Sequence, residues 1–227
     1  MEKIKVDNLS FSYPSSDKLA LDSVSLSIPE SEFVVLCGKS GCGKSTLLRH
    51  LKKSMNPYGN KFGSVCFDGE EIEEMNDRDA ASKIGYVQQN PDNQLVTDKV
   101  WHELAFGLES LGYSNSVIKR RVAEMASYFG IQTWFRKSVS ELSGGQKQLL
   151  NLASVMAMQP EVLILDEPAS QLDPIAARDF LSTVHRLNRE LGVTIVISEH
   201  RLEEIFPLAD RAIVMDEGRI IANAKPS

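Results

Sequence analysis

The sequence predicts an α/β fold in which a core with a mostly parallel sheet carries an N-terminal antiparallel β-subdomain and an inserted helical subdomain. Residues 1–30 alternate apolar and polar side chains with a period of two, which is typical of half-buried strands. Residues 97–157 carry apolar side chains at helical spacing instead. Short apolar runs alternate with helical patterns in the rest of the chain, and this alternation predicts a parallel sheet.

The elements of the first part of the core surround a glycine-rich turn. An apolar strand is expected at residues 32–37, directly before the turn, and a helix from Lys44 to about Met55 directly after it. Further strands are expected at residues 64–67 and 84–87. The turn therefore lies between a buried strand and a helix.

The helical subdomain is predicted over residues 91–158, between two core segments, 1–90 and 159–227, that complete one domain. Two apolar stripes define its helices. They consist of Leu104, Leu108 and Leu111, and of Ile118, Val122, Met125, Ala126 and Phe129. The returning core segment is expected to contain strands at 162–166, 193–198, 212–215 and 219–222, and a helix over 175–191.

Composition excludes several classes of protein. The 227 residues include 42% hydrophobic and 25% charged side chains, which is ordinary for a globular chain. A formal net charge of -6 argues against a nucleic-acid surface, because such a surface needs clustered Lys and Arg. Cys37, Cys42 and Cys66 lack metal-ligand spacing and favour a reducing compartment. No apolar stretch approaches the ~20 residues that cross a bilayer.

The glycine-rich turn fits the phosphate-loop template G-x-x-x-x-G-K-[ST] at every fixed position. The expected nucleotide-binding residues are Gly38, Lys39, Ser40, Gly41, Cys42, Gly43, Lys44, Ser45 and Thr46. Glycines let backbone N–H groups wrap a triphosphate, Lys44 supplies a cation to its oxygens, and the Ser45 hydroxyl is a ligand for Mg²⁺. An ordinary turn is the alternative. The preceding strand and the following helix favour a P-loop NTPase core, because the helix directs its positive end at the phosphates.

A second apolar strand ends in two acidic residues, Asp166 and Glu167. The strand is expected to bring Asp166 to the Mg²⁺ side of the phosphates. Glu167, beyond the strand end, is predicted as a catalytic residue that orients the attacking water or accepts its proton. Two solvated acids at a strand end are the alternative. The phosphate loop makes the catalytic interpretation the stronger one.

The segment Leu142-Ser143-Gly144-Gly145-Gln146 precedes an apolar helix. Its Ser and Gln have the spacing of a capping box, and a capped start with two glycines exposes backbone N–H groups that suit a γ-phosphate. The segment matches the signature motif of the ATP-binding-cassette (ABC) family letter for letter. The chain resembles ABC ATPases over residues 1–222, and the resemblance implies ATP and Mg²⁺ as cofactors.

The resemblance also implies roles for residues outside these motifs. Tyr13 resembles the aromatic residue that stacks on adenine, although a strand aromatic packed in the core is the alternative. Gln89 matches the glutamine that contacts Mg²⁺ or the lytic water. The neighbouring Gln88 is the alternative, and the register of Gln89 with the preceding strand favours Gln89. His200 matches the histidine that contacts the γ-phosphate. Asp173 lies in a segment that resembles the loop across the dimer interface, and the resemblance implies that it belongs to the ATP-binding residues.

The family further implies partners. Residues 143–146 are expected to act in trans on ATP held by a second ABC domain, in a homo- or heterodimer. Transmembrane transporter subunits are expected to hold the dimer at the cytoplasmic face of the cell membrane. Residues 89–94 and 105–108 are similar to those of energy-coupling-factor importers of vitamins and of cobalt or nickel ions. Residues 149–154 and 198–201 resemble the first half of tandem relatives with two ATPase domains, and the end at Ser227 fits an excised half.

Two other functions stay open from the sequence. A non-transport ABC ATPase of translation or DNA maintenance typically has basic linkers or long coiled-coil insertions, and neither is visible here. A nucleotide-binding module without turnover would lack Lys44, Glu167 or His200, all of which the sequence contains. We therefore predict an ATPase that powers a transporter.

Overall fold

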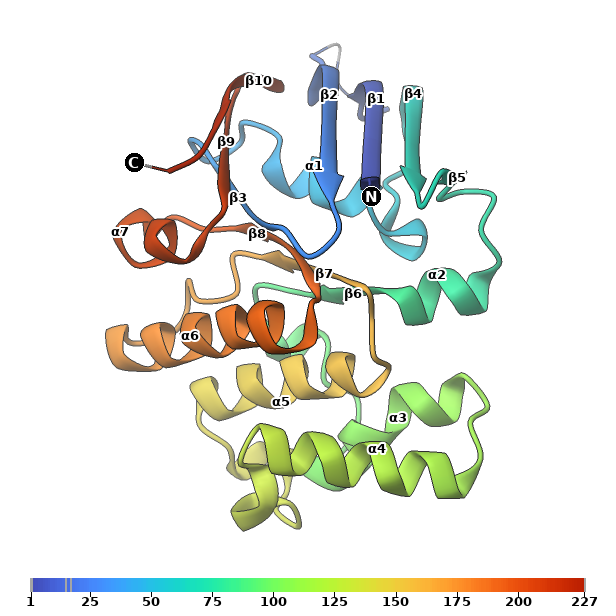
Figure 1. Ribbon diagram of the computed structural model, residues 1–227, viewed down its shortest axis with the longest axis vertical. Coiled ribbons are helices and arrows are strands. Elements are labelled where there is room, and N and C mark those ends of the chain that lie inside the picture. The colour runs from blue at the N-terminus through green and yellow to red at the C-terminus, as the bar shows by residue number, and fades with distance from the viewer. Residues whose placement is uncertain (1, 15, 17, 227) are drawn as a thin grey trace.

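A computed structural model describes residues 2–14, 16 and 18–226. Its elements are arranged in layers along the long axis of the molecule (Figure 1). A four-stranded antiparallel sheet lies at one end and a six-stranded sheet crosses the middle. The helices α3 (Val100–Ser110), α4 (Asn115–Tyr128) and α5 (Gly144–Ala157) lie at the other end (Figure 1).

The antiparallel sheet has the strand order β2-β1-β4-β5. Its strands are β1 (Glu2–Ser12), β2 (Leu21–Pro29), β4 (Asn60–Phe67) and β5 (Glu70–Glu71). The apolar residues Ile4, Val6, Leu9 and Phe11 of β1 are buried, and an irregularity of the strand pairing between Val6 and Leu9 shifts the alternation by one residue. The predicted antiparallel N-terminal strands are thus confirmed.

The six-stranded sheet has the order β10-β9-β3-β8-β7-β6 and is parallel except for the β9–β10 pair. Its strands are β3 (Phe33–Cys37), β6 (Ile84–Val87), β7 (Val162–Asp166), β8 (Thr194–Ser198), β9 (Arg211–Asp216) and β10 (Arg219–Ala224). Every residue of β3, β7 and β8 is buried, because the sheet is covered on both faces. In β3, Phe33 and Val35 join the core under the helices, and Val34 and Leu36 join the core under the antiparallel sheet.

Four further helices surround this sheet. They are α1 (Lys44–His50), α2 (Asp77–Lys83), α6 (Pro174–Leu191) and α7 (Leu202–Ile205). Single 3-10 turns cover Lys53–Met55, Pro91–Asn93, Ile131–Trp134, Val139–Glu141 and Phe206–Leu208. Among the described residues, no helix is long and apolar enough to cross a membrane.

The helix after the glycine-rich turn is shorter than predicted. It ends at His50 instead of Met55, where a separate 3-10 turn ends. Lys52 lies between the two with an extended backbone (φ -130°, ψ 113°). Its ammonium group donates to the carbonyls of Ala80 (2.8 Å) and Ala81 (3.1 Å) in the last turn of α2, where carbonyls lack intrahelical partners. The contact of Lys52 with α2 therefore ends α1 early, because it holds the chain in a direction that the helix would not follow.

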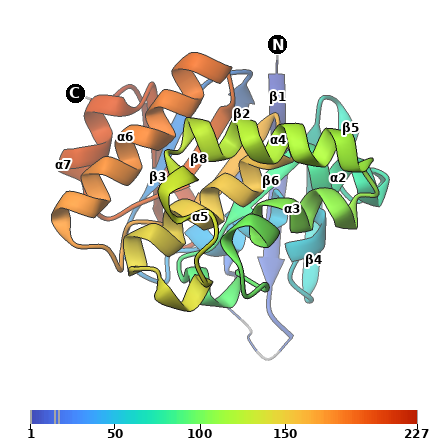
Figure 2. The ribbon, with the colours of Figure 1, turned by 90° about the horizontal axis from the view of Figure 1, so that it is seen from below.

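The helical layer covers the lower face of the sheet in Figure 1, and Figure 2 shows α3, α4 and α5 side by side across it. The predicted stripes are buried there, except that Leu111 and Phe129 are the C-caps of α3 and α4 and Leu111 is half-buried. The same apolar cluster continues from these helices into β3 and α6. The division into a core (1–90 and 159–227) and a helical subdomain (91–158) therefore stays a proposal.

Candidate functional site: the phosphate loop and its surroundings

The loop between β3 and α1 needs its glycines for steric reasons. Gly38, Gly41 and Gly43 have φ angles of 145°, 78° and 107°, a region that L side chains rarely occupy. A Cβ on Gly38 would lie 2.2 Å from the carbonyl oxygen of Met215, and one on Gly43 would lie 2.5 Å from that of Ala20. The backbone therefore passes where a side chain at Gly38 or Gly43 cannot fit, and the loop borders an open space.

That space is a cavity of about 290 Å³. Its lining combines loop residues with three residues from elsewhere in the chain: Tyr13, Ala20, Ser40, Gly41, Gly43, Lys44, Ser45, Thr46 and Glu167. The Lys44 ammonium group folds back over the loop and donates to the carbonyls of Gly38 (2.9 Å) and Lys39 (3.2 Å). A triphosphate in the cavity offers the same cation stronger acceptors.

Tyr13 lies at the cavity and not in the centre of the core. Its hydroxyl oxygen lies 3.2 Å from Oγ1 of Thr46, which follows the phosphate loop. Phe11 supports the ring in an edge-on contact with 4.9 Å between centroids, and the Phe11 ring packs in the same way against His50 at 4.7 Å. The position suits a stacking surface beside the phosphates.

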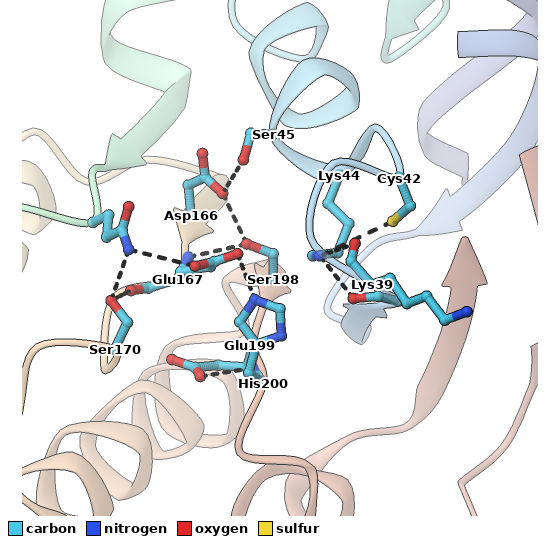
Figure 3. Close-up of polar contacts among 12 residues, drawn as sticks. Lys39, Cys42, Lys44, Ser45, Asp166, Glu167, Ser170, Ser198, Glu199 and His200 are labelled. Carbon is cyan, nitrogen blue, oxygen red and sulfur yellow. Dashed lines mark hydrogen bonds and ion pairs between the residues drawn. The ribbon is translucent and has the colours of Figure 1, made fainter. Parts of the chain in front are cut away.

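Asp166 ends β7 within reach of the loop (Figure 3). Its Oδ1 accepts hydrogen bonds from the hydroxyls of Ser45 and Ser198, both at 2.9 Å, and its Oδ2 accepts one from Tyr86 at 3.2 Å. Burial and the adjacent carboxylate raise the pKa of Tyr86, so this hydroxyl stays a donor. A hydroxyl and a carboxylate in contact are the oxygen ligands that Mg²⁺ prefers. Ser45 and Asp166 therefore fit a magnesium site.

Glu167 turns away from the strand that delivers it. Its φ of 47° is a left-handed conformation for a non-glycine residue. The backbone is fixed there because the Glu167 N–H donates to the carbonyl (3.1 Å) and the hydroxyl (3.0 Å) of Ser198. The carboxylate consequently points to the loop cavity, which it lines.

Two predicted residues converge on that carboxylate. His200 Nε2 lies 2.8 Å from Oε1 of Glu167, and the Gln89 amide donates to Oε2 at 3.4 Å and to Ser170 Oγ at 3.1 Å. Gln88 does not share this geometry: it lines a different groove, beside α3 and α5, and its backbone N–H and carbonyl are bonded to Gln94 and Gln148. The structure thus brings Gln89, Glu167 and His200 together.

Sequence reasoning missed several residues of this site. Tyr86 and Ser198 were visible only as members of strands, yet they lie at the carboxyl ends of β6 and β8, where neighbouring parallel strands meet the ligand. Glu199 is 1% exposed, and it accepts from the N–H groups of Ala169 (2.9 Å) and His200 (3.1 Å). Burial raises the pKa of Glu199. An acidic residue directly after the apolar strand β8 was the available signal.

The signature segment lies away from the loop of its own chain. None of the described residues in 143–146 lines the cavity, and α1 and α5 lie on opposite faces of the six-stranded sheet (Figure 1). Ser143 and Gln146 form the predicted capping box, with Ser143 Oγ accepting at 3.3 Å and Gln146 Oε1 at 3.0 Å. Asp173 caps α6 by accepting from the N–H groups of Ile175 and Ala176, both at 3.0 Å.

A glycine-rich phosphate loop on a parallel sheet, with an acid, a histidine and a glutamine meeting at its edge, defines a P-loop ATP-hydrolysing domain. The chain belongs to the ABC transporter family, whose model matches residues 21–170. It is an ATPase domain of that family, with ATP and Mg²⁺ as its ligands.

Individual relatives agree with this assignment. A putative ABC transporter ATP-binding protein of Bacillus thuringiensis subsp. konkukian is 52% identical over 222 residues, which cover 98% of this chain and 40% of the relative. One from Methanosarcina acetivorans is 42% identical over 226 residues, which cover 99% of this chain and 35% of the relative. The chain therefore spans less than half the length of these relatives.

Solved structures are similar over the whole chain. The structure of cbiO1 from Clostridium perfringens, part of the ABC transporter complex cbiONQ, has a TM-score of 0.89 at 31% identity and covers 100% of this chain and 90% of that one. A dimeric ATP-binding cassette in a post-hydrolysis state, bound to ADP and Pi, has a TM-score of 0.83 at 25% identity, with 99% of both chains covered. The likeness to cbiO1 agrees with the resemblance read from the sequence.

Proposed function

We propose that this chain hydrolyses ATP to power an energy-coupling-factor type importer of a vitamin or a transition-metal ion. The observation that carries hydrolysis is the Glu167 carboxylate, which lines the loop cavity and is contacted by Gln89 and His200. The importer class is supported by residues 89–94 and by the similarity to cbiO1, part of a transporter complex.

Each predicted site residue has a place in this proposal. The backbone of residues 38–46 and the Lys44 cation hold the triphosphate, and Tyr13 stacks on the adenine. Ser45, Asp166 and Gln89 hold Mg²⁺, which neutralises charge on the phosphate oxygens when bound. Glu167 orients the attacking water and accepts its proton, and His200 contacts the γ-phosphate while its bond to Glu167 fixes the carboxylate.

A second ABC domain completes the site in this proposal. Residues 143–146 lie away from their own loop cavity, so their exposed N–H groups are available to a γ-phosphate on another domain. Asp173 Oδ1 caps α6, so this residue shapes the loop at the proposed domain interface, where its carboxylate contributes to the ATP site. The second domain is either another copy or part of the same full-length protein.

We place the docking site for a transmembrane subunit in a groove of about 340 Å³ between α2, β6 and the helices α3 and α5. Phe106, which is 43% exposed, and Met158 give it apolar walls, and Gln88 contributes to its lining. A helical segment of a membrane subunit is the proposed occupant. Its contact with Gln88 would lie one residue from Gln89, so docking and hydrolysis would share one loop at the cytoplasmic face of the membrane.

Co-purification of the full-length protein from membranes tests the transport role. We expect small multi-helix membrane subunits to accompany it, and Phe106→Glu to abolish their capture while ATP affinity is kept. Ile221→Glu is a matched control, because Ile221 is a 63% exposed apolar residue on the remote strand β10. Capture of ribosomes or DNA in place of membrane subunits would overturn the transport proposal.

A further inference from the structure

Three side-chain amides form a cluster between the glutamine loop and the signature helix. Gln94 follows the 3-10 turn at Pro91–Asn93, while Gln148 and Asn151 lie one helical turn apart on α5. Gln148 and Asn151 are both 0% exposed. We call Gln94, Gln148 and Asn151 the amide cluster.

The amide cluster holds both backbone polar groups of Gln88. Gln94 Oε1 accepts from the Gln88 N–H at 2.9 Å, and the Gln148 amide donates to the Gln88 carbonyl at 3.2 Å. Gln94 also donates to the Tyr86 carbonyl at 2.7 Å. Residues 86 and 88 are thereby fixed immediately before Gln89, whose side chain reaches Glu167.

The cluster also ties this loop to the signature helix. Asn151 donates to Gln94 Oε1 at 3.0 Å, and Gln148 donates to the Pro168 carbonyl at 3.0 Å, one residue beyond Glu167. Both donors belong to the helix that begins with the signature glycines. The cluster therefore joins α5 to residues next to both members of the Gln89–Glu167 contact.

Packing alone does not account for these residues. Burying an amide is unfavourable unless its groups are bonded, and Gln148 Oε1 and Asn151 Oδ1 have no partner among the described residues. An apolar side chain of similar size would fill either position without that cost. The amides are therefore better explained by the contacts that they hold.

We propose that Gln94, Gln148 and Asn151 are positioning residues that set Gln89 against Glu167 and couple both to the signature helix. This inference rests on the proposed roles of Glu167 and Gln89. It differs from a structural role in one respect: loss of the cluster should change turnover through Gln89 and leave ATP binding intact.

A double-mutant cycle tests the coupling. Asn151→Leu removes the bond to Gln94 with little change in volume, and Gln94→Met removes all three bonds of that side chain. We expect each variant to lower kcat by about tenfold, the effect of losing roughly one well-formed hydrogen bond, with ATP Kd within about twofold because the phosphate loop is untouched. In a Gln89→Ala background, the same substitutions should have no further effect on kcat.

Asn188→Leu is a matched control. Asn188 is a 3% exposed amide that donates to the carbonyls of Ser31 (2.8 Å) and Val193 (2.9 Å), far from the loop cavity. Its loss should lower thermal stability and leave kcat unchanged. Hydrogen exchange supplies a readout without turnover: the Gln88 N–H should exchange faster in Gln94→Met than in the parent or in Asn188→Leu.

The outcomes separate the inference from the proposed function. If Gln89→Ala and Glu167→Gln both lower turnover, with a residual kcat still measurable in Gln89→Ala, but Asn151→Leu and Gln94→Met keep the parental kcat, only the inference is wrong. A fall in kcat that persists undiminished in the Gln89→Ala background also overturns it. If Glu167→Gln itself retains turnover, the catalytic site is wrong and the inference falls with it.

Discussion

Two helices of this chain begin at glycine-containing segments, and they begin in opposite ways. α1 follows Gly43, whose φ is 107°, and no side-chain cap is present at its start among the described residues. α5 follows Ser143, which forms a complete capping box with Gln146. Adding a Cβ at Gly43 would bring it 2.5 Å from a carbonyl oxygen, whereas one at Gly144 would meet nothing within 4 Å.

In the described part of the chain, the start of α1 lacks a side-chain cap and depends on a ligand to satisfy its N–H groups, whereas the start of α5 is capped by its own side chains. The first residues of α1 line the loop cavity, and in the proposed function the N–H groups of this first turn donate to phosphate oxygens. At α5 the side chains already satisfy two N–H groups, and the glycines leave the remaining ones open to a neighbour. The glycines before α1 allow the positive φ angles of the loop, and the glycines at the start of α5 leave its backbone N–H groups uncovered by side chains.

The largest effect is expected at Glu167, whose carboxylate lines the loop cavity at the start of α1. Glu167→Gln keeps size and hydrogen bonding but removes the proton-accepting charge, so hydrolysis should fall by roughly 10²–10⁴-fold while ATP still binds. Phosphate release measures the rate and calorimetry the affinity. Size-exclusion chromatography of this variant should show a dimer with Mg-ATP but not with ADP. If the second domain belongs to a different chain, that chain is added to the sample. Near-parental turnover would contradict the assignment of Glu167.

The glycines themselves test the comparison directly. Gly43→Ala places a methyl group against the Ala20 carbonyl at a positive φ, so unfolding free energy should fall by about 1–3 kcal/mol and ATP binding should be lost. Gly144→Ala should leave stability unchanged or raise it by up to ~1 kcal/mol, because alanine favours helix and has space there. Chemical denaturation measures both. Equal destabilisation by the two changes would refute the distinction between the two helix starts.

Tyr13→Ala tests the proposed adenine-binding end of the loop cavity at the start of α1. Loss of a stacking surface should weaken ATP binding by about 1–3 kcal/mol, and GTP binding by a similar amount, because stacking tolerates any base. Tyr13→Phe is the control, since it removes only the contact of the hydroxyl with Thr46. Calorimetry should find affinity largely retained in Tyr13→Phe. An unchanged ATP affinity in Tyr13→Ala would show that Tyr13 packs in the core and does not bind the base.

The smallest effect is expected at the α5 cap. Ser143→Ala removes the acceptor of the Gln146 N–H and should lower the unfolding free energy by about 1 kcal/mol. The affinity of the isolated chain for ATP should not change, because Ser143 lies outside its loop cavity. Thermal denaturation and calorimetry on the same sample measure the two quantities. A weakened affinity in the monomer would show that the signature acts within its own chain.

The sequence predicted local features best where one short segment contains all the determinants. The phosphate-loop template and the capping box are each set by a few consecutive residues, and the structure shows the loop conformation and the box that they predict. The end of α1 was wrong by five residues, because Lys52 bonds to α2, which a local pattern cannot show. The choice between Gln88 and Gln89 likewise depended on distant partners, Gln94 and Glu167.

By itself, the sequence determined the class of fold, the phosphate loop, the acidic strand end and the capped signature helix, because periodicity, backbone sterics and local hydrogen bonding act over a few residues. Only the tertiary structure decided which side chains meet at Glu167 and how the amide cluster joins the loop to α5. Gln89 and His200 reach one carboxylate because the ends of separate strands converge at one edge of the sheet, and sheet order is a long-range property that adjacent residues do not encode.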